Sequence, residues 1–153
     1  MFQFLFNTHT NKALYVLKAY LLNVAFIVPF VLFVLPHLSV GDSPSFTYDY
    51  ITFGFMVFIG PALETLFMGL IIWALLKLNL SIFKISFLSA LIWALLHSAQ
   101  YPIWGVGVFV LFLILSISYL VWLKRSFKEA FWVTTAIHSL NNGVVFLYEL
   151  CSS

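Results

Sequence analysis

Charge and cysteine are both scarce in this sequence. Only 8% of the 153 residues are charged, the formal net charge is +2, and Cys151 is the single cysteine. One cysteine excludes an internal disulfide and a Cys-x-x-Cys metal or redox site, and we expect no CaaX prenylation box because Cys151 is third from the end. So small a net charge, without a basic cluster interleaved with aromatic residues, excludes nucleic acid as a partner.

Two common hydrolase motifs are also missing. No serine stands in a Gly-x-Ser-x-Gly setting, so we expect no serine nucleophile of that type. The His-Glu-x-x-His pattern of zinc-binding helices is absent as well. Any hydrolytic chemistry in this chain must therefore come from other arrangements of side chains.

Apolar sequence is what the chain has in excess. Hydrophobic residues make up 63% of it, and its mean hydropathy is +1.09. A soluble domain of this length leaves too much of its surface in water to hide so many apolar side chains. Apolar runs of about 20 residues recur, each long enough to cross roughly 30 Å of hydrocarbon. The sequence therefore predicts an integral membrane protein whose surroundings are the lipid bilayer.

Five apolar spans are predicted, forming one all-α membrane domain over residues 1–153. We expect the first span to be a retained helix rather than a signal peptide, because its apolar stretch is too long and no clear small-x-small cleavage site follows it. Pro29 should bend this span, Pro61 should interrupt the second, and a polar loop, 37–49, should join the two. The spans cover roughly 13–36, 50–76, 85–101, 102–123 and 130–148.

The basic residues predict the orientation of these spans. All seven fall on one side of the five-span arrangement, while the alternate loops carry acidic residues or no charge. By the positive-inside rule, we expect the N-terminus in the cytoplasm and the C-terminus outside, with the protein in the cell membrane. The seven are Lys12, Lys18, Lys77, Lys84, Lys124, Arg125 and Lys128.

Four polar side chains lie deep inside the apolar spans: Glu64, His97, His138 and Asn142. A charged group at the centre of a membrane helix costs about 2.5–3.5 kcal/mol on insertion scales, so such residues usually face the protein interior and serve a function. At about 1.5 Å per residue, all four lie roughly 15–21 Å from the basic boundary of their helices. We therefore expect them to converge on one polar cavity near mid-membrane, open mainly toward the cytoplasmic side.

Helical spacing adds supporting residues to this set. Trp93 and His97 are four residues apart, so the indole lies one turn from the imidazole on the same face. Thr134, His138 and Asn142 repeat this interval and form a polar stripe. Small residues recur at the same interval along the third span, a pattern that lets membrane helices approach closely. They are Ser86, Ala90, Ala94 and Ser98.

Three of these segments resemble the motifs of the CPBP family, the CAAX-protease and bacteriocin-processing intramembrane peptidases. That family carries Glu-Glu-x-x-x-Arg on one membrane helix, Phe-x-x-x-His on a later one and His-x-x-x-Asn on a third. The corresponding strings here begin at Glu64, end at His97 and run from His138 to Asn142. The resemblance covers about residues 51–146, which it implies to be the catalytic core.

The chain departs from the family pattern mainly in the first motif. Thr65 stands in place of the second glutamate, and Gly69 stands in place of the arginine. Trp93 replaces the phenylalanine of the second motif. An arginine within about 4–6 Å would favour the ionised form of Glu64, so its absence bears on activity rather than on the fold. We expect Thr65, like Trp93, to support the site rather than to react.

The resemblance implies hydrolysis of a peptide bond inside the membrane, by water and without a cofactor. In the family's terms, Glu64 with His97 activates the attacking water, and His138 with Asn142 stabilises the oxyanion. These residue types also suit the roles by their own chemistry. The implied partner is a membrane-associated peptide or protein substrate, either prenylated and CaaX-like or small and hydrophobic like a bacteriocin.

Other interpretations of the same residues stay open. Each histidine, and Asn142, could in isolation simply form hydrogen bonds between helices. The altered first motif is compatible with a non-catalytic CPBP-like binding or immunity protein. Two imidazoles and a carboxylate can also bind zinc, which would make a metal-dependent protease, and two histidines facing each other can hold a b-type haem. The sequence specifies neither the substrate nor the oligomeric state.

Overall fold

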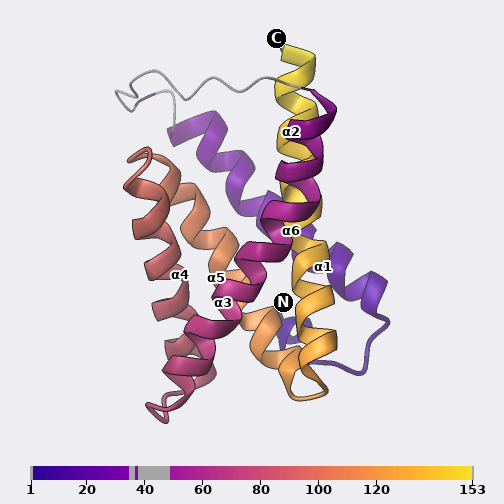
Figure 1. The fold of residues 1–153 in the computed structure, drawn as a ribbon, viewed down its shortest axis with the longest axis vertical. Coiled ribbons are helices and arrows are strands. Elements are labelled where there is room, and N and C mark those ends of the chain that lie inside the picture. Colours follow the sequence, from indigo (N-terminus) through magenta and orange to yellow (C-terminus); the bar gives the residue numbers. More distant parts are fainter. Residues whose placement is uncertain (1, 35–36, 38–48, 153) are drawn as a thin grey trace.

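The described part of the chain folds into a bundle of five long helical segments (Figure 1). The computed structural model describes residues 2–34, 37 and 49–152, so most of the predicted loop 37–49 lies outside the described residues. In two of the segments α-helical and π-helical stretches follow one another without a break. The elements are η1 (Phe2–Phe6), α1 (Lys12–Pro29) continued by η2 (Phe30–Val34), α2 (Tyr50–Gly54) continued by η4 (Phe55–Ile59) and α3 (Gly60–Leu76), α4 (Ile82–Ser98), α5 (Trp104–Leu123) and α6 (Phe127–Ser152).

Side-chain caps fix where three of these helices begin. Asn11 accepts hydrogen bonds from two backbone N–H groups in the first turn of α1. Asp49 caps α2 in the same way, and Ser81 caps α4. Such caps satisfy backbone donors that have no partner inside the helix. The second predicted span, 50–76, therefore matches the observed helix, whereas α4 begins before the predicted residue 85 because Ser81 caps it there.

Pro29 and Pro61, the two prolines expected to disturb helices, both lie within continuous helical segments. Pro29 is the last residue of α1, and the chain continues directly into the π-helical η2. Pro61 lies in the first turn of α3, directly after the π-helical η4, where the N–H of Gly60 donates to the carbonyl oxygen of Phe55. A proline has no N–H, and its ring displaces the carbonyl four residues earlier. A wider turn before or after the ring keeps the helix continuous.

The outer faces of the bundle are apolar. Three segments are long and apolar enough to cross a membrane, Lys12–Val34, Tyr50–Leu76 and Trp104–Leu123, with mean hydropathies of 2.1, 2.0 and 2.6. α4 is apolar but shorter, at 17 residues. Side chains such as Phe33 and Trp73 are more than half exposed, which suits lipid rather than water. The protein is an all-α integral membrane protein, as predicted.

α5 forms the centre of the bundle. It packs against α1, α3, α4 and α6, and most of its side chains from Leu111 to Trp122 are buried. Its closest approach is to α4: a Cβ atom added to Gly105 would collide with the side chain of Ser98 and the carbonyl oxygen of Ala94. The close packing predicted from the small residues of this helix is therefore confirmed at Ala94 and Ser98.

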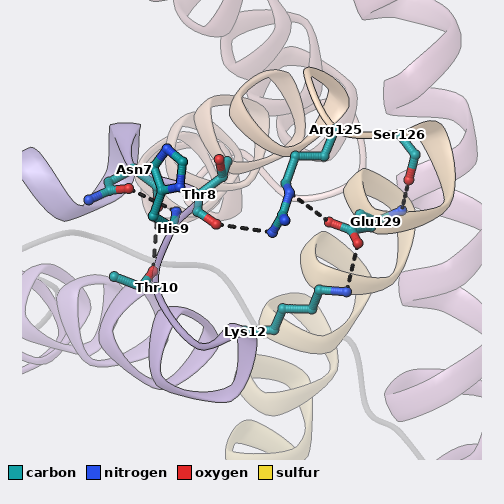
Figure 2. A network of polar contacts seen from close by, with 8 residues as sticks. All are labelled: Asn7, Thr8, His9, Thr10, Lys12, Arg125, Ser126 and Glu129. Atoms are coloured by element: carbon teal, nitrogen blue, oxygen red, sulfur yellow. Dashed lines mark hydrogen bonds and ion pairs between the residues drawn. The ribbon is translucent and has the colours of Figure 1, made fainter.

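One end of the bundle, which we call the basic end, carries the turns after α3 and after α5 (Figure 1). There, Lys12 Nζ lies 2.8 Å from Glu129 Oε1, and Arg125 Nε lies 3.7 Å from Glu129 Oε2. Arg125 also donates a hydrogen bond to the carbonyl oxygen of Thr8 at 3.1 Å (Figure 2). The hydrogen bond from Lys12 holds the pKa of Glu129 below its ordinary value. These contacts join the N-terminal segment to the turn between α5 and α6.

Candidate active site

Four polar side chains from three helices line one cavity. Glu64 of α3, His97 of α4, and His138 and Asn142 of α6 all lie in its wall. Its volume, about 610 Å³, is in the range of ligand-binding pockets, and the structure thus brings together the four residues predicted from the sequence. The rest of the wall is mostly apolar: Asn23, Ile27, Phe30, Val31, Tyr101, Ile103, Trp104, Gly107, Val108, Leu111, Phe112, Asn141 and Val145.

The cavity lies in the half of the bundle away from the basic end. Its wall uses the C-terminal part of α1, the C-terminal end of α4 and the N-terminal half of α5, represented by Ile27, His97 and Trp104. Figure 1 shows the turn between α4 and α5 at the end opposite the turns after α3 and α5. Its wall thus lies away from the basic end, and the prediction that the cavity opens mainly toward the cytoplasmic side stays a prediction. The depth of the polar residues could be counted from the sequence, but the apolar residues that complete the wall carry no signal of their own.

Glu64 lies beside His138. Its Oε2 is 3.6 Å from His138 Nε2, so the pair joins α3 to α6 slightly beyond direct hydrogen-bond distance. The imidazole is almost fully buried, with 4% of its side chain exposed, whereas 31% of the Glu64 side chain is exposed. The sequence-based interpretation paired Glu64 with His97, but the contact that the structure gives to Glu64 is with His138. The carboxylate thus has an imidazole partner and reaches open space in the cavity.

His97 is oriented by its own helix. Its Nδ1 lies 2.9 Å from the carbonyl oxygen of Trp93, one turn earlier in α4. A carbonyl oxygen can only accept, so Nδ1 carries the hydrogen in this contact. In the neutral ring, Nε2 is then unprotonated and can take a proton from a reacting group. The predicted support from Trp93 therefore comes through its backbone, while its ring centroid lies 5.8 Å from that of His97.

Phe112 of α5 is a site residue that the sequence did not reveal. Its ring is 1% exposed and stacks on Trp93, with centroids 4.5 Å apart and planes 13° apart. The same ring contacts both imidazoles: its centroid lies 5.7 Å from His97 and 5.4 Å from His138. Phe112 therefore positions the two histidines, which come from different helices. As one of eighteen phenylalanines, it carries no distinguishing pattern in the sequence.

Asn142 is partly committed to the backbone. Its Nδ2 donates a hydrogen bond of 2.9 Å to the carbonyl oxygen of Met56 in η4. An amide carries two hydrogens, so one remains for another acceptor in the cavity. The contact also ties α6 to the π-helical stretch that precedes Glu64 on the same helical segment. Asn142 therefore helps to hold the position of Glu64 as well as lining the cavity.

Two further asparagines line the cavity and were missed. Asn23 of α1 donates through Nδ2 to Oδ1 of Asn141 on α6, and both side chains are buried. The sequence could have indicated Asn23, because it is a polar side chain deep inside an apolar span, as Glu64 is. Asn141 was overlooked because its neighbour Asn142 fits the four-residue spacing.

Thr65 and Thr134 lie behind the cavity rather than in its wall. Both are buried, at 1% and 0% exposure. Gly69, where the resemblance predicts an arginine, is packed against α5: an added Cβ atom would lie 2.5 Å from the Tyr119 hydroxyl oxygen. The phenol of Tyr119 therefore occupies the space into which a longer side chain at position 69 would extend. The glycine of the altered first motif thus packs against Tyr119 of α5.

Among the residues that the structure describes, no group of three or more histidine, cysteine, aspartate or glutamate side chains is placed to hold a metal ion. The side chains of Glu64 and His138 are close enough to share one ion. His97 lies on α4, where its ring contacts Phe112. The two histidines contact the same phenylalanine ring, that of Phe112.

Comparison with known proteins agrees with the motifs. No curated protein and no solved structure matches the chain. A family model described as type II CAAX prenyl endopeptidase Rce1-like matches residues 45–144, which is more than half of the chain. This range contains Glu64, His97, His138 and Asn142. The core predicted from the motifs runs over 51–146. The chain therefore belongs to the Rce1-like family of type II CAAX prenyl endopeptidases.

Proposed function

We propose that this protein is an intramembrane endopeptidase that uses water to hydrolyse a peptide bond of a membrane-associated substrate. The observation that carries the proposal is the meeting of Glu64, His97, His138 and Asn142 in one cavity between apolar helices. Ionisable groups at this depth are costly, and a purely structural role would need only neutral hydrogen-bonding groups. Membership of a family of prenyl endopeptidases supports the same chemistry.

In the proposed reaction, Glu64 and His97 act on the water. One of them takes a proton from the water while its oxygen attacks the carbonyl carbon of the scissile bond, and the carbonyl electrons move onto the oxygen. The exposed part of the Glu64 carboxylate and the unprotonated Nε2 of His97 suit this step. When the carbonyl re-forms, the carbon–nitrogen bond breaks and the proton passes to the leaving amine. One water is consumed, and two peptide ends are released.

His138 and Asn142 are the proposed donors to the oxyanion. His138 Nε2 lies next to Glu64, and Asn142 has one amide hydrogen besides the one it gives to Met56. Donors held in advance at a developing negative charge are worth about 2.7–4 kcal/mol each in well-studied hydrolases, because they need no reorganisation during the reaction. Phe112 and Met56 would hold these two donors in place from α5 and η4.

The proposed substrate is either a prenylated CaaX-like peptide or a small hydrophobic peptide. We also propose that the basic end faces the cytoplasm of the cell membrane, following the positive-inside rule. The cavity then lies in the outer half of the bundle, which favours a small hydrophobic peptide that reaches that half over a cytoplasmic CaaX protein. Reporter fusions after Leu123 and after Tyr148 test the orientation: the first should report cytoplasm and the second the external side.

The direct test is cleavage by the purified protein in lipid nanodiscs. Two probes separate the substrate classes: a farnesylated Cys-Val-Ile-Met peptide and an unprenylated apolar peptide of similar length. Mass spectrometry should find two products whose masses sum to that of the peptide plus one water. Addition of EDTA should leave the rate unchanged. Loss of activity with EDTA and its return with zinc would replace the proposal by a metal-dependent protease, and probe binding without cleavage would replace it by the non-catalytic binding or immunity protein.

A further inference from the structure

Asn23 of α1 lines the cavity and carries a buried hydrogen-bond acceptor without a partner among the described residues. The residue is 2% exposed and lines the same wall as Glu64, His138 and Asn142. Its Oδ1 has no hydrogen-bond partner among the residues that the structure describes. Asn23 precedes residues 45–144, which the family model matches, so it is not part of the family motifs.

The direction of two neighbouring amides decides that this free atom is an oxygen. Asn141 Nδ2 donates a hydrogen bond of 2.8 Å to the carbonyl oxygen of Ile137. A carbonyl oxygen cannot donate, so Asn141 must turn its NH₂ group toward Ile137 and its Oδ1 toward Asn23. Asn23 must in turn present its own NH₂ group to Asn141. Its Oδ1 is left over, and it can only bind a group that donates a hydrogen.

A second buried polar contact of α1, made by Tyr15, joins segments of the protein away from the cavity. The Tyr15 hydroxyl donates to the carbonyl oxygen of Leu5 at 3.0 Å and lies 3.2 Å from Ser118 Oγ. Tyr15 is buried but does not line the cavity. Its polar group is used by the protein itself, whereas Asn23 lines the cavity and keeps one buried acceptor without a partner among the described residues. Leaving a buried polar atom unpaired costs stability. Ser86 and Trp122 also keep an unpaired buried atom, but of these three residues Asn23 is the one in the cavity wall.

We propose that Asn23 is a substrate-binding residue whose Oδ1 accepts a backbone N–H of the peptide in the cavity, with Asn141 holding the amide in place. This inference rests on the proposed function in taking the ligand to be a peptide. A backbone N–H is the donor that any peptide supplies, whatever its side chains. The contact would fix the register of the chain beside Glu64 and would make α1 a part of the substrate site.

The test measures binding in the Glu64→Gln background, so that the peptide is not consumed. The probe is a fluorescent, unprenylated apolar tetrapeptide, together with three analogues in which one backbone N–H at a time is replaced by an ester oxygen. Loss of one neutral hydrogen bond should weaken binding about three- to tenfold. We expect one analogue to show this loss with Glu64→Gln alone and no loss when Asn23→Leu is added.

The outcomes separate this inference from the proposed function. Equal ester effects with and without Asn23→Leu, or no ester effect at any position, would overturn the role of Asn23 even if the protein cleaves peptides. If the Glu64→Gln protein itself does not bind the peptide, the proposed role of Asn23 is overturned as well. Binding that depends on Asn23 in a protein whose wild type cleaves nothing would reject the peptidase and keep the binding site.

Tyr15→Phe is the matched control, because it removes a buried polar contact of the same helix away from the cavity. It should shift the unfolding temperature without changing the ester effect. Asn23→Ala provides a second variant if Asn23→Leu does not fold, since the smaller side chain avoids overpacking against α6. Both Asn23 variants should abolish the same single ester effect.

Discussion

Glu129 and Glu64 are two glutamates whose carboxylates have different neighbours. Glu129, at the basic end, lies 2.8 Å from Lys12 and 3.7 Å from Arg125. Glu64, in the cavity, lies 3.6 Å from the imidazole of His138, and the arginine expected in its motif is replaced by Gly69. The first carboxylate is held by fixed cations, whereas the second lies beside a buried imidazole.

We take this difference to separate a structural carboxylate from the one proposed to react. A glutamate locked between a lysine and an arginine stays ionised and joins two segments of the chain. A glutamate beside histidines can exchange protons with them and with a bound water, which general acid–base catalysis requires. The variants below break one side of the comparison and leave the other intact.

The largest effect should come from removing the imidazole partner of Glu64. We expect His138→Gln to lower kcat by about 10²–10⁴-fold, because an oxyanion donor and the neighbour of Glu64 are lost together. Cleavage of the peptide probes in nanodiscs measures the effect. His9→Gln, at an exposed histidine of the basic end, is the control and should leave kcat unchanged. A His138→Gln protein with wild-type kcat would remove this residue from the mechanism.

The next effect should come from Phe112, which contacts both imidazoles. Phe112→Leu should lower kcat about tenfold to a hundredfold, because small displacements of catalytic groups are costly. Phe109→Leu removes a ring from the same helix that contacts Phe87 instead, so it controls for the loss of packing. Equal kcat values for the two variants would show that Phe112 only fills space.

Part of this site could be predicted from the sequence because membrane helices make polar residues conspicuous. The depth of Glu64, His97, His138 and Asn142 follows from counting residues to the nearest basic boundary, and the five spans follow from apolar runs. Phe112 could not be predicted, because its role depends on which face of α5 meets α4 and α6. Helical periodicity gives no answer for a helix that is apolar on all sides.

The packing around Gly69, which stands where the family motif has an arginine, could not be predicted from the sequence either. The sequence reveals that the arginine is missing, but it does not reveal that Tyr119, fifty residues later on α5, fills the space beside Gly69. Nor could the sequence predict on which side of the polar layer the cavity lies. Both features depend on how helices distant in the sequence cross one another.

A smaller effect, on stability rather than activity, should come from Gly69→Ala. The added Cβ atom would lie 2.5 Å from the Tyr119 hydroxyl oxygen, so we expect a loss of about 1–3 kcal/mol in the free energy of unfolding. Gly54→Ala is the control, because nothing lies within 4 Å of its added Cβ atom. Unfolding in mixed micelles measures both. Equal stability of the two variants would contradict the close contact between α3 and α5.

The smallest effect should come from the carboxylate at the basic end. Lys12 holds the pKa of Glu129 below its ordinary value of 4.5, so the ion pair contributes stability above that value and loses it as the pH falls through the lowered pKa. The unfolding temperature of the wild type should therefore fall more between pH 7 and pH 3 than that of Glu129→Gln. Because the network is exposed, added salt should reduce the difference. Parallel pH curves for the two proteins would show that the pair contributes nothing.

The central claim is that Glu64 is the reactive carboxylate, and the most direct measurement compares Glu64→Gln with Glu129→Gln in the same cleavage assay. Both changes replace a carboxylate by an amide of the same shape. Glu64→Gln should lower kcat by at least about 10²-fold without changing the helix content, while Glu129→Gln should cleave at the wild-type rate. Cleavage that survives Glu64→Gln would show that Glu64 is not the reactive carboxylate.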